Sequence, residues 1–170
     1  MRTLKVEVVP YDAYWTKNFL DIKNEILKVL DKLVLSIEHV GSTAVCGLWA
    51  KPIIDIDIVI KDYSVLSDVI LALSSIGYRH EGNLGIYGRE AFTYEGKEYL
   101  QKHHLYVCPE DSVELRKHMA FRDYLRTHPE AVLEYSQIKQ RGAKLYPYDV
   151  ERYIEHKSFF IKRIYEELGF

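Results

Sequence analysis

The chain is 170 residues long, with 48% hydrophobic residues, 28% charged residues and a formal net charge of −2 at pH 7. This length suits one ordinary domain, and the charge argues against a surface coated for non-specific duplex binding, so we find no strong nucleic-acid signature. Two cysteines without a CxxC pair, no signal-like start and no apolar run of membrane-spanning length lead us to expect a cytoplasmic protein that crosses no membrane.

Three stretches of the N-terminal half predict β-strands, and the third is a nearly continuous β-branched run of the kind found in central strands. These predicted strands span residues 4–9, 33–40 and 53–60. Two helices are predicted as well: Asp12 can cap the first, and Asp62 or Ser64 can start the second, which ends at Gly77. The apolar positions of the first helix recur at steps of three and four: Trp15, Phe19, Ile22, Ile26 and Val29.

A hairpin is predicted next. Residues 92–94 and 99–100 flank the turn Glu95-Gly96-Lys97, and residues 103–108 continue the second arm. From residue 110 onward the pattern is helical, with capping-box spacing between Thr127 and Glu130. Pro147 breaks this helical run, and Asp149 can cap a last helix.

These elements predict an α/β (α+β) fold in a single domain. Residues 1–109 would form a mixed β-sheet with flanking helices, and residues 110–170 a helical C-terminal third packed on that sheet.

Asp55 and Asp57 are the first candidate site residues. Side chains at i and i+2 of a strand point to the same face, so the two carboxylates lie side by side. Two unpaired like charges on a central strand are costly, and a divalent cation such as Mg²⁺ is a common resolution. The same pattern also suits solvated acids on an exposed face, or pairs with Lys51 or Lys61.

Gly41-Ser42 follows a predicted strand, shortly before the two acids. A glycine lets the backbone approach a phosphate, and a helical turn through Thr43 would aim free N–H groups at the anion. Alone, this dipeptide also fits an ordinary strand-to-helix turn with Ser42 as N-cap. A phosphate cradle and two carboxylates in this order together favour a Mg²⁺–nucleotide site.

The block Glu38-His39-Val40-Gly41-Ser42-Thr43-Ala44-Val45, followed by Ala50-Lys51-Pro52-Ile53-Ile54-Asp55, resembles the GrpB family. Gly-Ser followed by Asp-x-Asp is similar to the signature of the nucleotidyltransferase superfamily typified by DNA polymerase beta. The resemblance continues through the segments 104–107, 121–125 and 157–161, with Tyr135 and Lys139. It implies a nucleotidyltransferase-like fold and supplies no substrate.

The chain departs from these patterns at three places. Cys46 stands where members commonly have proline, and Tyr106 stands where we expect the second histidine of His-Leu-His. Superfamily enzymes usually place a third carboxylate on a later strand, where this chain has His104 and Tyr106, with Glu98 as a distant substitute. His104 would therefore act as a base or a hydrogen-bond donor.

Read at three- and four-residue steps, each of three C-terminal helices carries one basic residue in its apolar face. These residues are Arg122, Lys139 and Lys157. In the last helix the face reads Val150, Ile154, Lys157, Ile161, Ile164 and Leu168. Snorkelling to water explains any one of them, whereas three together predict convergence on an anion, either the two carboxylates or a triphosphate.

We therefore predict a Mg²⁺-dependent nucleotidyltransferase that transfers a nucleoside monophosphate from a nucleoside triphosphate, expected to be ATP, to an acceptor that the sequence leaves open. Asp55 and Asp57 would hold the metal, with His104 as the third catalytic residue. The predicted phosphate-binding residues are Gly41, Ser42, Thr43, Lys51, Arg122, Lys139 and Lys157. Two alternatives remain open: a nucleotide sensor without catalysis, and a partner-binding module that uses the fold as a scaffold.

Overall fold

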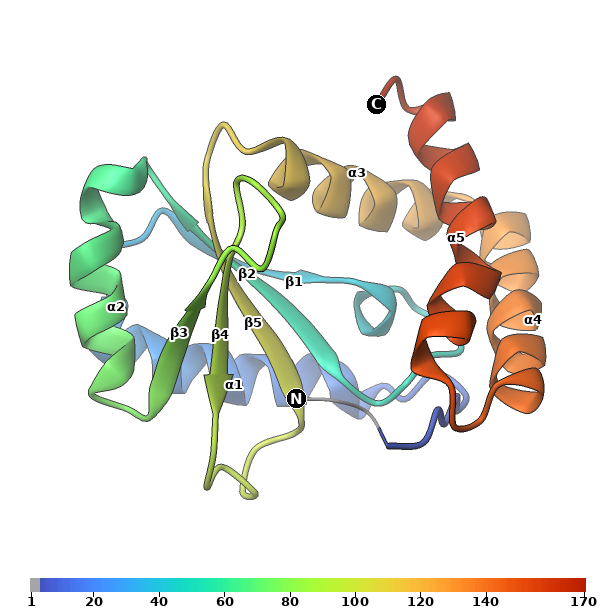
Figure 1. Ribbon diagram of the computed structural model, residues 1–170, viewed down its shortest axis with the longest axis horizontal. Helices are drawn as coiled ribbons and strands as arrows, with labels where there is room; N and C mark the ends of the chain where they lie inside the picture. Colours follow the sequence, from blue (N-terminus) through green and yellow to red (C-terminus); the bar gives the residue numbers. More distant parts are fainter. Residues whose placement is uncertain (1–3) are drawn as a thin grey trace.

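The computed structural model describes residues 4–170. Its five strands form one mixed sheet in the order β1-β2-β5-β4-β3, with helices on both faces (Figure 1). The strands are β1 Ser36–Val40, β2 Ile54–Ile60, β3 Tyr78–Gly82, β4 Glu90–Tyr94 and β5 His103–Pro109. The helices are α1 Tyr14–Leu30, α2 Leu66–Ser74, α3 Val113–Thr127, α4 Pro129–Leu145 and α5 Val150–Glu167, with short 3₁₀ turns η1 Ser42–Ala44 and η2 Tyr63–Val65. The predicted α+β class with a mixed sheet is confirmed.

β2 lies between two neighbours of opposite direction. It pairs with β1 antiparallel and with β5 parallel, and β4 and β3 extend the sheet beyond β5 with antiparallel pairs. The alternation along β2 sorts its side chains between the two faces of the sheet. Ile54, Ile56 and Ile58 are buried in the main apolar core, so Asp55 and Asp57 face the other side.

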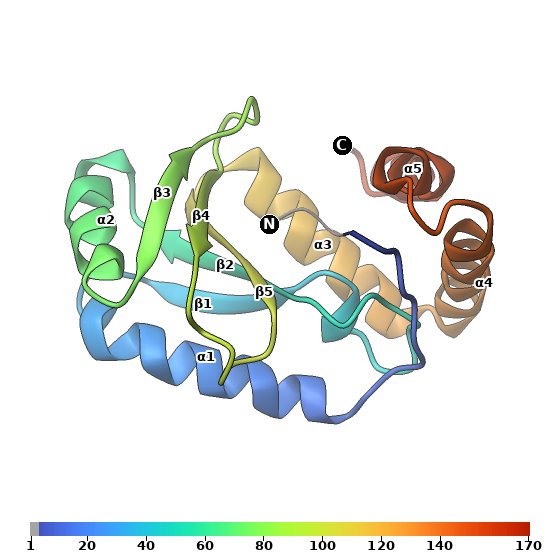
Figure 2. The ribbon, with the colours of Figure 1, turned by 60° about the horizontal axis from the view of Figure 1, so that its bottom comes forward.

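The two faces of the sheet are covered differently (Figure 2). α1 and α2 contribute Ile22, Ile26 and Val69 to the main core on the isoleucine face. On the carboxylate face, α3 packs Leu115 against Val59 of β2. α4 and α5 lie side by side at one end of the sheet and share a second apolar cluster with α3. The carboxylates therefore face the helical C-terminal third.

Two predicted strands are wrong. Residues 4–9 form no strand, because Val9 makes only an isolated bridge with Ala50 while the N–H of Val6 donates to the carbonyl of Pro147. Residues 99–100 belong to no strand, and β5 begins only at residue 103. The reason is tertiary: the Lys97 ammonium lies 2.6 Å from a carboxylate oxygen of Glu25 on α1, and this buried pair draws the connection away from the sheet.

The capping box predicted from Thr127 and Glu130 at the start of α4 does not form. The Thr127 hydroxyl donates to the carbonyls of Asp123 and Tyr124 at the end of α3, so it does not cap the next helix. His128 precedes α4, and Pro129 occupies its first turn. The predicted cap at Asp149 is confirmed, because its carboxylate accepts the N–H of Arg152.

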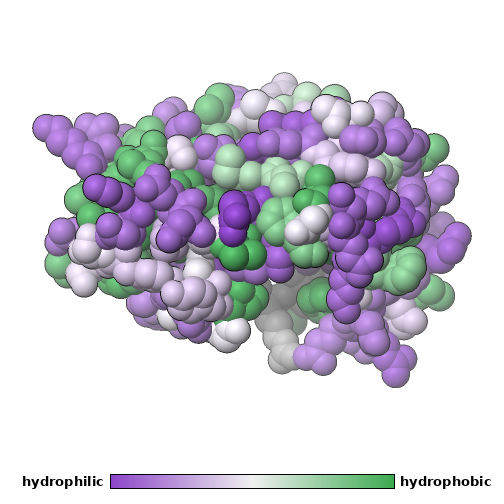
Figure 3. Space-filling model, turned by 90° about the horizontal axis from the view of Figure 1, so that it is seen from above, coloured by the Kyte–Doolittle hydropathy of each residue, from purple (hydrophilic) through white to green (hydrophobic). Residues whose placement is uncertain are grey.

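Among residues 4–170, no helix is both long enough and apolar enough to cross a membrane. Seen from above, the molecule presents many hydrophilic residues, with hydrophobic ones in groups between them (Figure 3).

Candidate functional site

The two acidic residues of β2 are the centre of the site. Asp57 is fully buried and Asp55 is half-buried, although β2 holds them on the same face. Their strand neighbours are fixed by register: Asp55 lies opposite His104 of β5, and Asp57 lies opposite Tyr106. The strand pairing thus brings the predicted metal-binding residues next to the predicted base.

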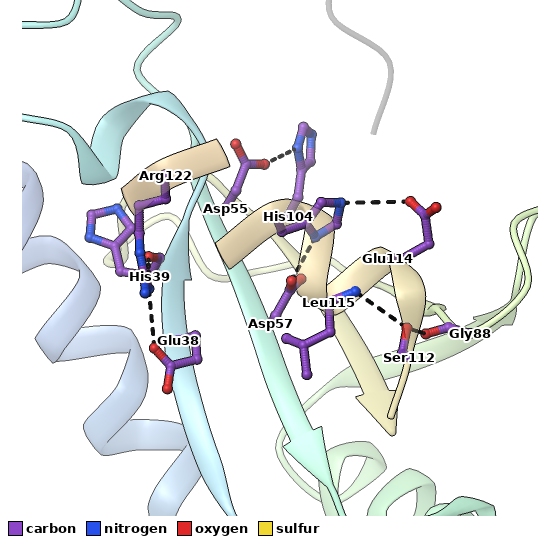
Figure 4. A network of polar contacts seen from close by, with 11 residues as sticks. Glu38, His39, Asp55, Asp57, Gly88, His104, Ser112, Glu114, Leu115 and Arg122 are labelled. Carbon is purple, nitrogen blue, oxygen red and sulfur yellow. Dashed lines mark hydrogen bonds and ion pairs between the residues drawn. The ribbon is translucent and has the colours of Figure 1, made fainter. Parts of the chain in front are cut away.

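Each carboxylate has a histidine partner (Figure 4). Nδ1 of His104 lies 2.9 Å from Oδ1 of Asp55, and Nδ1 of His118 on α3 lies 2.6 Å from Oδ2 of Asp57. A carboxylate of Glu114, one turn earlier on α3, lies 3.9 Å from Nε2 of His118. Hydrogen bonds with the two histidines therefore orient the two carboxylates.

Burial and charge act against each other on these groups. Burial raises the pKa of Asp55, but the hydrogen bond and charge of His104, with the charges of Lys157 and His118, bring it below its ordinary value. Burial lowers the pKa of His118, but its hydrogen bond with Asp57 and the charge of that carboxylate raise it above the ordinary value. Asp55 is therefore ionised, and His118 tends to hold its proton.

One carboxylate oxygen in the site has no partner. Oδ1 of Asp57 is buried without a hydrogen bond to any described residue. A buried carboxylate oxygen left in this state costs free energy, which a bound cation would remove. Within residues 4–170, no group of three or more His, Cys, Asp or Glu side chains is arranged to hold a metal ion. A cation here would therefore need ligands from outside the protein.

The turn after β1 packs directly on Asp55. Gly41 has φ 72° and ψ −171°, a conformation open essentially to glycine alone. A Cβ added there would lie 2.3 Å from Oδ2 of Asp55. Gly41 therefore gives the backbone a close approach to the carboxylate.

Ser42 and Thr43 point to different partners. The Lys139 ammonium from α4 donates to the Ser42 hydroxyl and, at 3.1 Å, to the carbonyl of Trp49. The Thr43 hydroxyl is buried and lies 2.9 Å from Nε2 of His39. Of the predicted cradle, Gly41 and Ser42 line the cavity beside Asp55, whereas Thr43 braces β1.

Three lysines lie in the same cavity as Ser42. Lys51, Lys139 and Lys157 line one cavity, and burial lowers the pKa of each. The charge of Lys157 lowers the pKa of Lys51 and Lys139 further, while Asp55 opposes the shift in all three. Positive charge packed this closely favours an anionic ligand.

Lys157 reaches this cavity from a helix face slightly different from the predicted one. The buried positions of α5 are Tyr153, Phe160 and Ile164, whereas Ile154 of the predicted stripe is 50% exposed. Lys157 nevertheless points inward, with its ammonium 5.3 Å from the centre of the Tyr153 ring.

Arg122 does not join the lysines. Its guanidinium lies 3.1 Å from a carboxylate oxygen of Glu38 and 2.8 Å from one of Asp123, and it donates to the carbonyl of His39. Figure 4 shows it beside β1, away from Asp55 and Asp57. Acidic residues of the protein therefore neutralise its charge, and of the three basic residues only Lys139 and Lys157 line a cavity with Asp55.

Two adjoining cavities of about 220 Å³ and about 390 Å³ share Asp55, and the smaller one also reaches Asp57. Both are lined by Ser42, Asp55, Arg89 and Lys157. Tyr106 also lines both cavities. The smaller cavity has three further aromatic side chains: Phe121, Tyr135 and Tyr165. The larger adds His104, Lys51 and Lys139. An aromatic end suits a base, and a lysine-rich end suits phosphates.

Two residues of this site, His118 and Arg89, were not predicted from the sequence. His118 had a signal, because it shares a helix face with Leu115 and Arg122 at steps of three and four. Arg89 lies in a glycine-rich connection with no periodic pattern, so nothing in the sequence indicated that it enters the site.

The fold defines the class. The solved structure of Cid1 in complex with its short product ApU matches this chain with a TM-score of 0.56 and 9% sequence identity, over 81% of this chain and 43% of that chain. This likeness shows that the chain shares the nucleotidyltransferase-like fold of Cid1.

The chain belongs to the GrpB family, whose model, described as GrpB protein, matches residues 5–167. The crystal structure of conserved protein GrpB from Enterococcus faecalis matches with a TM-score of 0.84 and 31% identity, over 95% of this chain and 96% of that chain. The Bacillus subtilis protein YqkA is 32% identical over 158 residues, which are 93% of this chain and 46% of YqkA. The chain therefore spans about half the length of that relative.

Proposed function

We propose that this protein is a Mg²⁺-dependent nucleotidyltransferase that moves a nucleoside monophosphate from a nucleoside triphosphate, ATP in the first instance, to an acceptor hydroxyl. The observation that carries the proposal is the pair Asp55 and Asp57 on one face of β2, with Oδ1 of Asp57 buried and unpartnered among the described residues. Support comes from the fold neighbours, since Cid1 structures are described with MgATP and with a UTP analog.

The residues present fit a magnesium ion. Oδ1 of Asp55 and Oδ2 of Asp57 are occupied by histidines, which leaves one oxygen of each carboxylate for a cation. Mg²⁺ favours one or two carboxylates, completed by waters and substrate phosphates. When bound, the ion would neutralise phosphate charge and lower the barrier to attack at phosphorus.

The protein's own residues would do the rest. Gly41 and Ser42 would receive the β and γ phosphates, and Lys157 with Lys51 would stabilise charge on the leaving pyrophosphate. The acceptor oxygen forms a bond to the α-phosphorus, and the bond from that phosphorus to the bridging oxygen breaks, releasing pyrophosphate. In its neutral form, with the Nδ1–H donated to Asp55, His104 would accept the hydroxyl proton at Nε2.

A second candidate is a nucleotide-binding protein without transfer activity. The observation in its favour is that β5 places His104 and Tyr106 beside the two acids, where superfamily enzymes usually carry a third carboxylate. Glu98 does not substitute, because it is exposed and lines a separate cavity with Gly96 and Leu100.

Pyrophosphate release separates the two candidates. The four common triphosphates are supplied with Mg²⁺ and acceptors of three classes: small hydroxyl compounds, RNA ends and the protein itself. We expect release with at least one combination, and its loss in Asp57→Asn, while the control Asp68→Asn, exposed on α2, keeps it. Nucleotide binding without release in every combination would select the second candidate.

A further inference from the structure

Arg89 is a cation without a partner in the candidate site. It precedes β4, and its guanidinium carbon lies 4.3 Å from the centre of the Tyr106 ring. Its Nε is buried with no hydrogen-bond partner, and the side chain forms no ion pair within residues 4–170. A guanidinium held against a ring with a buried, unsatisfied N–H lacks the oxyanion that such a group ordinarily binds. Because Arg89 lines both cavities, an anion could reach it from either one.

The position of Arg89 in the sheet separates it from the phosphate cradle. Gly41 and Ser42 follow β1, on one side of β2. Arg89 stacks on Tyr106 of β5, which lies on the other side of β2. The carboxylates of β2 therefore stand between the turn after β1 and the guanidinium.

In-line transfer to phosphorus requires the attacking and leaving oxygens on opposite sides of that atom. If the pyrophosphate leaves on the β1 side, where Gly41 and Ser42 lie, the acceptor arrives on the β5 side. That side presents His104, the proposed base, together with Tyr106 and Arg89. The group that meets Arg89 then belongs to the acceptor and not to the triphosphate.

We propose that the acceptor carries an oxyanion, a phosphate or a carboxylate, close to its reacting hydroxyl, and that Arg89 binds this oxyanion. The inference rests on the proposed nucleotidyl transfer and deepens it by naming the acceptor class. The planar guanidinium can donate two parallel hydrogen bonds to such a group while Tyr106 supports its face.

The test is a binding experiment on the intact chain saturated with Mg²⁺ and α,β-methylene ATP, which cannot be cleaved at the reacting bond. Inorganic phosphate and acetate are titrated at constant ionic strength, with acetamide as the neutral counterpart of acetate, and heats of binding are recorded. We expect at least one anion to bind roughly 10-fold or more tighter than acetamide. Whether phosphate, acetate or both do so identifies the oxyanion.

Arg89→Gln should weaken that anion roughly 10- to 100-fold and leave the affinity for α,β-methylene ATP unchanged. Arg89→Lys keeps the charge and loses the planar fork, so its affinity for the anion should lie between those of the wild type and Arg89→Gln. The matched control is Arg79→Gln, an exposed arginine on β3, which should behave like the wild type. Both Arg89 variants should fold, because they remove no hydrogen bond among the described residues. The melting curve of each variant checks this first.

Three outcomes contradict the inference. If Arg89→Gln weakens the nucleotide analogue as strongly as the anion, Arg89 serves the triphosphate, and the proposed function stands without the acceptor class. If neither anion exceeds acetamide in the wild type, no oxyanion site exists beside the nucleotide. If α,β-methylene ATP with Mg²⁺ does not bind the wild type at all, both the proposed function and the inference fall.

Discussion

Lys157 is the residue whose role depends most on side-chain direction. It leaves α5 toward Asp55 and lines both cavities, and burial lowers its pKa while the charge of Asp55 opposes that shift. No salt bridge holds it among the described residues, so its ammonium is available to a phosphate. Its removal should therefore affect ligand binding more than folding.

Lys157→Met keeps the apolar stem and removes the charge. We expect triphosphate affinity to fall by about 1.5–3 kcal/mol, the range for a hydrogen bond to a charged group, while the ligand-free protein changes stability by less than about 1 kcal/mol. The matched control is Lys162→Met, an exposed lysine of the same helix. Equal nucleotide affinity in wild type and Lys157→Met would remove Lys157 from the site.

Two buried histidines make stability depend on pH. Burial lowers the pKa of His39 and of His103 to about 4 from an ordinary value of 6.5. His39 stacks on Phe19, and His103 stacks on Tyr94 and bonds to the hydroxyl of Tyr78. Between pH 6.5 and 4 the unfolded chain binds protons that the folded protein refuses, so stability falls as pH falls.

Each histidine should contribute a slope of about 1.4 kcal/mol per pH unit in that window. His118 has the opposite sign, since its raised pKa adds stability that is lost as pH rises above 6.5. Urea unfolding between pH 6.5 and 4.5 measures the slope. His103→Gln should reduce it by the contribution of one proton, about 1.4 kcal/mol per pH unit. An unchanged slope in that variant would mean that His103 is protonated in the folded state.

At the scale of elements, the turn that joins β1 to η1 sets the distance between backbone and carboxylate. Gly41→Ala places a methyl group 2.3 Å from Oδ2 of Asp55, in a conformation that L-residues avoid. We expect a loss of about 1–3 kcal/mol of stability, together with loss of Mg²⁺–nucleotide binding because Asp55 must move.

The control for this substitution is Gly47→Ala in the same connection. Gly47 also has a positive φ, of 80°, but a Cβ there would meet no atom within 4 Å. This variant should lose stability from backbone strain alone and keep its nucleotide affinity. If Gly41→Ala binds nucleotide like Gly47→Ala, the close approach at Gly41 does not matter for the ligand.

Elements whose pattern is local could be predicted from the sequence. The alternation of isoleucine and aspartate predicted both β2 and the shared face of its acids, because a strand has a period of two. The spacing of Trp15, Phe19, Ile22 and Ile26 predicted α1 for the same kind of reason, with a period of 3.6. Asp149 was predicted as a cap because its hydrogen bond reaches only three residues ahead.

Features that depend on distant contacts could not be predicted in this way. Residues 4–9 look like a strand, but their neighbours are Ala50 and Pro147, which no local pattern reveals. Arg122 has the helical position of a site residue, yet Glu38 takes up its charge from 84 residues away. Arg89 enters the site only because β4 pairs with β5, and that pairing is set by the whole sheet.

At the scale of the whole molecule, the candidate site joins two parts of the chain. The sheet supplies Asp55, Asp57 and the turn at Gly41, whereas α4 and α5 supply Lys139 and Lys157. A triphosphate bound between them would neutralise the lysines, and a cation would neutralise the acids. Burial already lowers the pKa of the lysines, and Oδ1 of Asp57 is buried without a partner among the described residues. The nucleotide and Mg²⁺ together should therefore stabilise the fold more than either alone.

The melting temperature measured with nucleotide, with Mg²⁺ and with both tests this claim most directly. At a ligand concentration of 100 Kd the gain is about 2.7 kcal/mol. For a chain of this length, at about 2–4 °C per kcal/mol, that corresponds to a rise of roughly 5–11 °C. The rise should appear only with both components, and it should vanish in Asp55→Asn and Asp57→Asn while each variant stays folded. No rise with any of the four common triphosphates at millimolar concentration with Mg²⁺ would contradict the account.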